Sequence, residues 1–185
     1  MPVAVRRGGA PRRGAPVAAL ALWAALFAFV ADASPYDPPL APPEERADAV
    51  FLDKSERRLD LLRDGQVIRS YEVSLGFAPE GHKAQEGDGR TPEGEYVLDW
   101  RNETSRSHLS LHISYPDADD IARARAAGVS PGGNIMIHGI RNGWGWVGPL
   151  HRLRDWTDGC IAVTNAEIRE IWSLVAYGTP ITIQE

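Results

Sequence analysis

Short runs of apolar and β-branched residues recur along most of the chain, each bounded by turn residues. This pattern predicts a domain built mainly from strands. The strands are expected at residues 49–53, 57–62, 66–76, 95–100, 109–115, 134–138 and 180–184. Asp64-Gly65, between the second and third runs, predicts a tight hairpin turn.

The third run alternates between apolar and polar positions. Its apolar positions are Val67, Tyr71, Val73 and Leu75, which predicts a half-buried strand, although the alternation slips at Ile68. A segment with five glycines and two prolines follows, from residue 76 to residue 94. Loops of that length in a compact domain are usually functional or mobile.

Two segments carry a helical pattern instead. Residues 117–128 place acidic side chains first, arginines later and a glycine at the end, an order that complements the helix dipole. Residues 165–177 predict a second helix, which Thr164 caps, Glu167 completes as a capping box and Gly178 ends. One apolar face of this helix is formed by Ile168, Ile171, Trp172 and Val175. The fold class is therefore mainly β (α+β), with two short helices.

The N-terminal segment has the pattern of an export signal. Four arginines precede an uncharged apolar run, residues 16–31, and the small-x-small triplet Ala31-Asp32-Ala33 follows. Together they predict a secretory signal at residues 1–33, with an uncleaved membrane anchor as the alternative. The proline-rich residues 34–46 predict an extended linker, and residues 47–185 a single domain.

Composition narrows the function. The chain of 185 residues has a formal net charge of −5 and an isoelectric point of about 5.6, so its charge does not suggest nucleic-acid binding. It contains one cysteine, Cys160, and therefore cannot form an internal disulfide. A lone thiol in an exported protein is either buried or used.

Cys160 and His138 are the candidate catalytic pair. His138 ends a short apolar strand before Gly139 and a glycine-rich loop, where a side chain can face a cleft. Gly159 allows a close backbone approach, and the amides of Gly159 and Cys160 could hold an oxyanion. An imidazole near a thiol can activate it as a nucleophile. The spacing of 22 positions alone leaves this open.

Several segments together resemble the L,D-transpeptidase catalytic domain of bacterial peptidoglycan enzymes. They are I-M-I-H-G at 135–139, D-W-T-D-G-C-I-A-V-T-N at 155–165, S-L-G at 74–76, G-D-G-R-T-P-E-G-E-Y at 87–96 and I-S-Y-P at 113–116. The resemblance extends from about residue 49 to residue 183, and is greatest to the YafK-like murein subgroup. It implies a β-sandwich of the L,D-transpeptidase type with a catalytic-site loop.

The resemblance also implies a reaction. Cys160 would attack the carbonyl between a diamino acid and D-Ala in a peptidoglycan stem peptide, with His138 as base and no metal or cofactor. A second amine would resolve the acyl-enzyme, giving a wall crosslink or an attached protein. Water would give a carboxypeptidase. Such an enzyme works in the periplasm or cell envelope, and it contacts a membrane only if its N-terminal segment stays uncleaved.

Two positions depart from the family pattern. Many members have histidine immediately before the Gly-Cys pair, where this chain has Asp158, and asparagine or arginine two positions after the cysteine, where it has Ala162. An unpaired carboxylate at Asp158 would disfavour the thiolate. The gap between His138 and Cys160 is also longer than usual. These departures leave open whether the enzyme transfers the acyl group to an amine or hydrolyses it. The hydrolase alternative includes an enzyme that releases a wall-linked lipoprotein. A non-catalytic wall-binding module is a third, less favoured alternative.

Other residues near the pair have two interpretations each. Trp144, Trp146 and Trp156 could stack on substrate or pack in the core. Arg141 and Arg152 could pair with substrate carboxylates or face solvent, as could Arg154. Gly139, Thr157 and Asp158 are possible supporting residues. Three other histidines are expected to be structural or at the surface, with His151 as the alternative base; these three are His108, His112 and His151.

Overall fold

The computed structural model describes residue 1 and residues 38–185 of the chain. The predicted export signal, beyond Met1, and the first residues of the predicted linker lie outside these described residues. The compact unit described below spans residues 36–185, of which residues 38–185 are described. Within the described part of the chain, none of the helices has both the length and the apolar character needed to span a bilayer.

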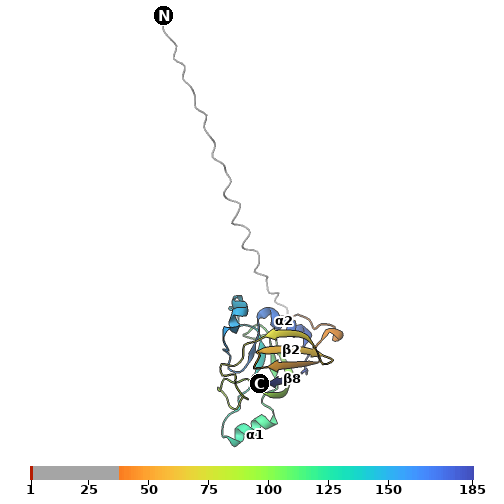
Figure 1. Ribbon diagram of the computed structural model, residues 1–185, viewed down its shortest axis with the longest axis vertical. Helices are drawn as coiled ribbons and strands as arrows, with labels where there is room; N and C mark the ends of the chain where they lie inside the picture. Colours follow the sequence, from red (N-terminus) through yellow and green to blue (C-terminus); the bar gives the residue numbers. More distant parts are fainter. Residues whose placement is uncertain (2–37) are drawn as a thin grey trace. The chain divides into compact units, whose positions relative to one another are not determined.

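Eight strands form one mixed sheet in the order β3-β2-β1-β8-β4-β5-β6-β7. Figure 1 labels two of these strands, β2 and β8, and both α-helices. Their bounds are β1 Ala49–Asp53, β2 Arg58–Arg63, β3 Gln66–Glu72, β4 Gly94–Asn102, β5 Ser110–Ile113, β6 Met136–His138, β7 Ile161–Ala162 and β8 Pro180–Gln184. The β1–β8 and β6–β7 pairs are parallel, and the other neighbours are antiparallel. The prediction of a mainly β, α+β domain is confirmed.

The sheet curls at β4. Residues 94–97 of this strand pair with β8, whereas residues 98–102 pair with β5 across a register shift between Leu98 and Trp100. The parts of the sheet on either side of β4 therefore form two walls of one core. The core between them contains residues of all eight strands and residues between 168 and 174 of the chain's last helix.

The β2–β3 hairpin explains the irregular third run. The expected turn at Asp64-Gly65 is confirmed, with both residues at positive φ. Leu61 pairs with Arg69 but Leu62 pairs with Val67, so Ile68 is an extra residue in β3. This bulge shifts the alternation by one position. Val67 is consequently 56% exposed, and its predicted burial was wrong.

Two α-helices and two 3-10 segments accompany the strands: η1 Pro43–Glu45, which precedes β1, and α1 Ala118–Ala126, η2 Gly145–Leu153 and α2 Asn165–Leu174. The capping box of Thr164 and Glu167 at the start of α2 is confirmed. The helix ends three residues before its predicted end at Tyr177, because Val175 is extended and bridges to Ala47. The four residues of the predicted apolar face are all buried.

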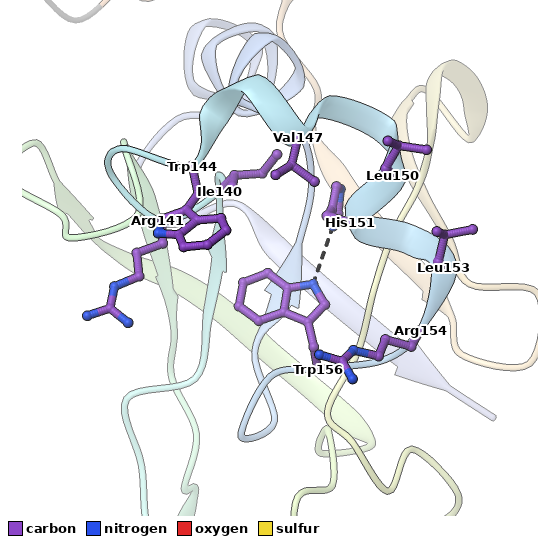
Figure 2. Close-up of a pocket in the computed structure, with 9 residues that line it drawn as sticks. All are labelled: Ile140, Arg141, Trp144, Val147, Leu150, His151, Leu153, Arg154 and Trp156. Carbon is purple, nitrogen blue, oxygen red and sulfur yellow. Dashed lines mark hydrogen bonds between the residues drawn. The ribbon is translucent and has the colours of Figure 1, made fainter.

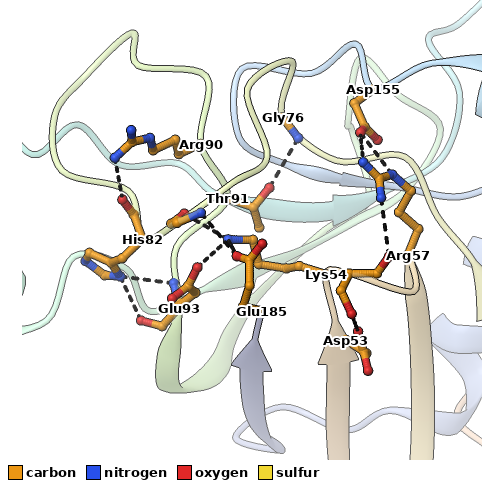
Figure 3. Close-up of polar contacts among 12 residues, drawn as sticks. Asp53, Lys54, Arg57, Gly76, His82, Arg90, Thr91, Glu93, Asp155 and Glu185 are labelled. Carbon is orange, nitrogen blue, oxygen red and sulfur yellow. Dashed lines mark hydrogen bonds and ion pairs between the residues drawn. The ribbon is translucent and has the colours of Figure 1, made fainter.

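The loop between β3 and β4 is held to the sheet at several points (Figure 3). The ammonium of Lys54, at the end of β1, donates to the Gly81 carbonyl at 2.8 Å and to the Glu93 carboxylate at 2.5 Å. Gly76 passes so close to the loop that a Cβ there would lie 2.0 Å from the Gly89 carbonyl oxygen. These contacts hold the loop to β1 and to its own first residues, and Arg90 of the loop lies against Gly159, which precedes Cys160.

Candidate active site

His138 and Cys160 are brought together by two adjacent parallel strands. In the β6–β7 pairing, Ile137 lies opposite Ile161 and His138 opposite Ala162. Cys160 immediately precedes β7, two positions before Ala162, so His138 is its diagonal neighbour on the same face. The rise and spacing of strands put the two Cα atoms about 8 Å apart, within reach of an imidazole and a thiol.

A short turn before β7 shapes the backbone at the thiol. The Thr157 hydroxyl donates to the Cys160 carbonyl at 2.7 Å and accepts from the Gly159 amide at 3.2 Å. Gly159 has φ of 122°, and a Cβ there would lie 2.5 Å from the Arg90 carbonyl oxygen. The glycine is therefore required by the close approach of the β3–β4 loop. To hold an oxyanion, its amide would have to leave Thr157.

The contacts of His138 determine which ring nitrogen is available. His138 is 8% exposed, and its Nδ1 lies 2.6 Å from the Gly139 carbonyl oxygen. Because a carbonyl only accepts, Nδ1 carries the proton, and Nε2 of the neutral ring is an acceptor. The Asn165 side chain accepts from the Ile140 amide at 2.8 Å and packs against Gly139. The start of α2 thus positions the peptide that orients the imidazole.

The environment keeps both members of the pair neutral at rest. Burial raises the pKa of Cys160, with the Asp158 carboxylate adding to the shift against a backbone contact from Met136. Burial lowers the pKa of His138 in spite of the Gly139 carbonyl. The thiol donates to the Asn134 carbonyl at 3.6 Å. Among residues 38–185, no hydrogen bond joins the thiol to His138. To donate to His138, the thiol would have to rotate away from the Asn134 carbonyl.

Trp156 lies between two imidazoles. Its ring is 5.9 Å from the His138 ring and 6.3 Å from the His151 ring, in edge-to-face arrangements. The indole N–H donates to Nδ1 of His151 at 3.4 Å. Burial and the neighbouring Arg152 charge lower the pKa of His151 to about 4. Trp156 therefore separates His151 from His138.

A groove of about 720 Å³ lies beside Trp156 and His151 and under η2 (Figure 2). Trp156, Arg141 and Arg154 line it together with His151. Its apolar wall consists of Ile140, Trp144, Val147, Leu150 and Leu153. The predicted substrate-binding residues Arg141, Trp144 and Trp156 thus meet in one groove.

A second cavity, of about 590 Å³, lies on the thiol side of the site. Asp158 and Asn134, whose carbonyl accepts from Cys160, are among its lining residues. Glu86 and Lys83 also line it. The Lys83 ammonium is paired with Asp88 at 2.8 Å. Asp158, the departure from the family pattern, therefore faces a polar cavity next to the thiol.

The structure places other candidates away from the groove. Arg152 is a predicted substrate-binding residue, but it pairs with Glu167 and thereby joins η2 to the start of α2. Trp146 is 78% exposed and stacks on Trp144 outside the lining of the groove. His112 pairs with Asp99 at 2.6 Å. No group of three or more potential metal ligands occurs among residues 38–185.

Sequence reasoning missed two contributions to the site. Asn165 was assigned only to the start of a helix, although its place in the quoted V-T-N segment was the available signal. Ser74 bridges to Ala162 as an added strand and covers the β7 edge. Its side chain donates toward His151, either to the carbonyl at 3.2 Å or to Nδ1 at 3.3 Å. No local sequence pattern indicates that contact.

Comparisons with known proteins give the same fold. The helical cell-shape-determining protein Pgp2 from Campylobacter jejuni matches with 25% identity and a TM-score of 0.54, over 74% of this chain and 47% of that one. Bd1075 from Bdellovibrio bacteriovorus matches with 25% identity and a TM-score of 0.52, over 81% and 52%. An L,D-transpeptidase from Stackebrandtia nassauensis, at 12% identity and a TM-score of 0.50 over 74% and 55%, supports the fold only. The chain thus spans about half the length of these proteins.

The sequence itself also matches a family model. A search of curated proteins finds no match to the chain. The model of the YkuD L,D-transpeptidase catalytic domain matches residues 47–183, which include both strands of the candidate pair and almost the whole described domain. The YafK-like subgroup stays a prediction. On this match the chain belongs to the L,D-transpeptidase catalytic domain family.

Proposed function

We propose that this chain is an exported cysteine acyltransferase that cleaves the bond between the diamino acid and D-Ala of peptidoglycan stem peptides. The observation that carries the proposal is the β6–β7 pairing, which sets His138 beside Cys160. The Gly139 carbonyl fixes the tautomer that a general base needs. The family match supports the substrate class.

The reaction starts from a neutral thiol and a neutral imidazole. As Sγ of Cys160 attacks the diamino-acid carbonyl carbon, Nε2 of His138 takes the thiol proton. The resulting imidazolium keeps its bond to Gly139 and lies against the ring of Trp156. The carbon–nitrogen bond to D-Ala then breaks, and His138 returns the proton to the leaving amine. A thioester to Cys160 remains.

The carbonyl oxygen becomes negative during this step and requires hydrogen-bond donors. The amide of Cys160 is the donor nearest the attacking atom. The Gly159 amide is the second candidate, and it contributes once it exchanges Thr157 for the substrate oxygen. Thr157 would otherwise only hold the turn. Replacing Thr157 should therefore change the conformation of the turn and, through the Gly159 amide that it now holds, the stabilisation of the oxyanion.

An incoming amine or water completes the cycle. An amine from a second stem peptide forms a crosslink, and one from a wall-linked lipoprotein forms a protein attachment; water gives an L,D-carboxypeptidase. In each case His138 takes a proton from the nucleophile and the thiol is restored. Pgp2 is described as determining helical cell shape, and we extend a role in cell shape to this chain as part of the proposal.

The direct test incubates the purified protein with a disaccharide tetrapeptide that contains diaminopimelate, followed by mass spectrometry. The matched variant is Cys160→Ala. We expect loss of D-Ala and a crosslinked dimer with the wild type, and intact substrate with the variant. Tripeptide without dimer would identify a carboxypeptidase instead.

An inactive wild type on this substrate calls for a lipoprotein-linked muropeptide as the second substrate. Release of the lipoprotein that depends on Cys160 would identify the hydrolase alternative. Turnover by Cys160→Ala on either substrate would refute the nucleophile. A wall-binding module would sediment with peptidoglycan equally well as wild type and variant, and would act on neither substrate.

A further inference from the structure

The segment that carries η2 presents apolar side chains to solvent. Four large apolar side chains between residues 144 and 153 are more than half exposed, namely Trp144, Trp146, Leu150 and Leu153. Elsewhere among residues 38–185, ten consecutive positions hold at most two exposed large apolar side chains. Trp144 stacks on Trp146 and lines the groove together with the two leucines (Figure 2). The four side chains therefore form one surface, which we call the η2 patch.

The inward contacts of the same segment are polar, which reverses the usual arrangement of a surface turn. His151 is buried and accepts from the Trp156 indole, and Arg152 pairs with Glu167 at the start of α2. These contacts fix the segment to the domain through its polar side chains, so its apolar side chains stay in water. An exposed apolar surface of this kind marks an interaction site.

The charged side chains of this segment are all basic. Residues 141–154 contain three arginines and neither aspartate nor glutamate. Arg152 is paired, whereas Arg141 and Arg154 are exposed and lie on opposite sides of Trp156 (Figure 2). The η2 patch therefore has an apolar centre and a basic rim. Its charge complements a partner that is apolar inside and negatively charged at its boundary.

Three kinds of partner differ in what they offer to the η2 patch. A glycan strand would stack on a tryptophan ring, but it would leave Leu150 and Leu153 against hydroxyl groups. A second copy of the chain, related by twofold symmetry, would bring the arginines of two identical patches together. A bilayer accommodates all of these side chains, because tryptophan concentrates at the membrane interface, leucine enters the acyl region and arginine attracts anionic headgroups.

We propose that the η2 patch docks the domain on the surface of a bilayer that contains anionic lipids. Trp146, Leu150 and Leu153 enter the boundary between headgroups and acyl chains, to a depth of about 5–10 Å. Arg141 and Arg154 lie at the level of the headgroups. The inference does not depend on the proposed reaction, and it adds lipid as a second partner of the domain.

Binding to vesicles tests the proposal. The core residues and the partly buried residues packed on them all lie after position 40, so residues 34–185 keep the fold and omit the apolar run of the predicted signal. This protein is mixed with vesicles of phosphatidylcholine alone, or of phosphatidylcholine and phosphatidylglycerol in equal parts, and the bound fraction is measured by flotation. We expect stronger binding to the mixed vesicles. The binding should weaken as salt rises from about 0.1 M to about 1 M, because the Debye length falls from about 10 Å to about 3 Å.

Matched variants separate the η2 patch from the rest of the surface. Trp146→Ser and Leu153→Ser should each lower the partition coefficient on mixed vesicles about 10-fold, the effect of removing one apolar side chain from the bilayer. Trp100→Ser should leave it unchanged, because Trp100 is about half exposed but lies on β4. Arg141→Gln should lower it about 5-fold, whereas the exposed Arg125 on α1 can be replaced by glutamine without effect.

Depth is measured with brominated acyl chains, which quench only tryptophans that reach them. At saturating lipid, Trp146→Ser should reduce the quenching that Trp100→Ser keeps. Absence of binding to mixed vesicles, or equal losses in these two variants at unchanged melting temperature, would overturn the proposal. So would Trp146-dependent binding to peptide-free glycan strands in place of lipid, which would make the patch a glycan platform. A dimer that Leu153→Ser disrupts, in protein that does not bind vesicles, would likewise overturn it and assign the patch to a second copy of the chain.

Discussion

Replacing Lys54 by methionine should destabilise the domain more than any exposed ion-pair change. The Lys54 side chain is 1% exposed. Its three donors are all used, by the Gly81 carbonyl, the Glu93 carboxylate and, at 3.2 Å, the Glu185 carboxylate (Figure 3). Methionine fills a similar volume but leaves these acceptors without their cation. The change therefore removes the polar contacts while it keeps the packing.

The expected magnitude follows from the exposure of the partners. Breaking a buried pair by removing one member costs about 3–5 kcal/mol. Glu93 and Glu185 are 27% and 54% exposed, so water reaches both once Lys54 is gone. We therefore expect the lower end, about 3 kcal/mol, which corresponds to a melting temperature lowered by about 6–12 °C for a domain of this size.

Thermal unfolding followed by circular dichroism measures the effect. The matched control is Arg69→Met, because Arg69 pairs with Glu170 at 2.6 Å but both side chains are about half exposed. Such pairs contribute about 0–1 kcal/mol. The reasoning is refuted if Lys54→Met and Arg69→Met melt within 2 °C of each other, a margin of about 1 kcal/mol on the same scale.

Three further changes test other features. Gly76→Ala places a Cβ 2.0 Å from the Gly89 carbonyl oxygen, so we expect a loss of about 1–3 kcal/mol in urea unfolding, together with slower D-Ala release; unchanged values would contradict the close approach. Burial raises the pKa of Asp88, but a lysine ammonium and backbone amides outweigh burial and hold it at about 2, below its ordinary 3.8. The Asp88 carboxylate therefore stabilises the fold above pH 4, and this contribution is lost as the pH falls toward 2. Between pH 4 and pH 2 the urea midpoint of Asp88→Asn should therefore change less than that of the wild type. Burial raises the pKa of Cys160, and the Asp158 carboxylate raises it further. Asp158→Asn should therefore lower the pKa of Cys160 and shift the pH profile of its alkylation by iodoacetamide to lower pH. An unshifted profile would show that the Asp158 charge does not affect the thiol.

Local pattern was sufficient for most of the strands and for the start of α2. The hairpin at Asp64-Gly65 and the capping box of Thr164 and Glu167 depend on residues within a few positions of one another, and the structure confirms both. The end of α2 depends on Val175 pairing with Ala47, a contact between distant segments. Sequence periodicity does not contain that information.

The same distinction applies to the candidate site. His138 and Cys160 were found from motifs, but their register was not, because the β6–β7 pair is only two residue pairs long and β7 is too short to show a period. The segment 145–153 was expected to be a loop, and its 3-10 turns place His151 in the groove. For Arg152, the sequence suggested a role in substrate binding that the structure does not support. Its guanidinium pairs instead with Glu167 at the start of α2.

The place of β8 in the middle of the sheet has a consequence for the order of folding. Residues 180–184 pair with β1 on one side and with β4 on the other, so β1 and β4 do not become part of one sheet until these residues arrive. Pairings between segments this far apart in the chain form slowly, because a long loop must close first. On the ribosome, the earlier strands emerge before their central partner has been synthesised. The nascent chain therefore stays incompletely folded until synthesis has passed β8.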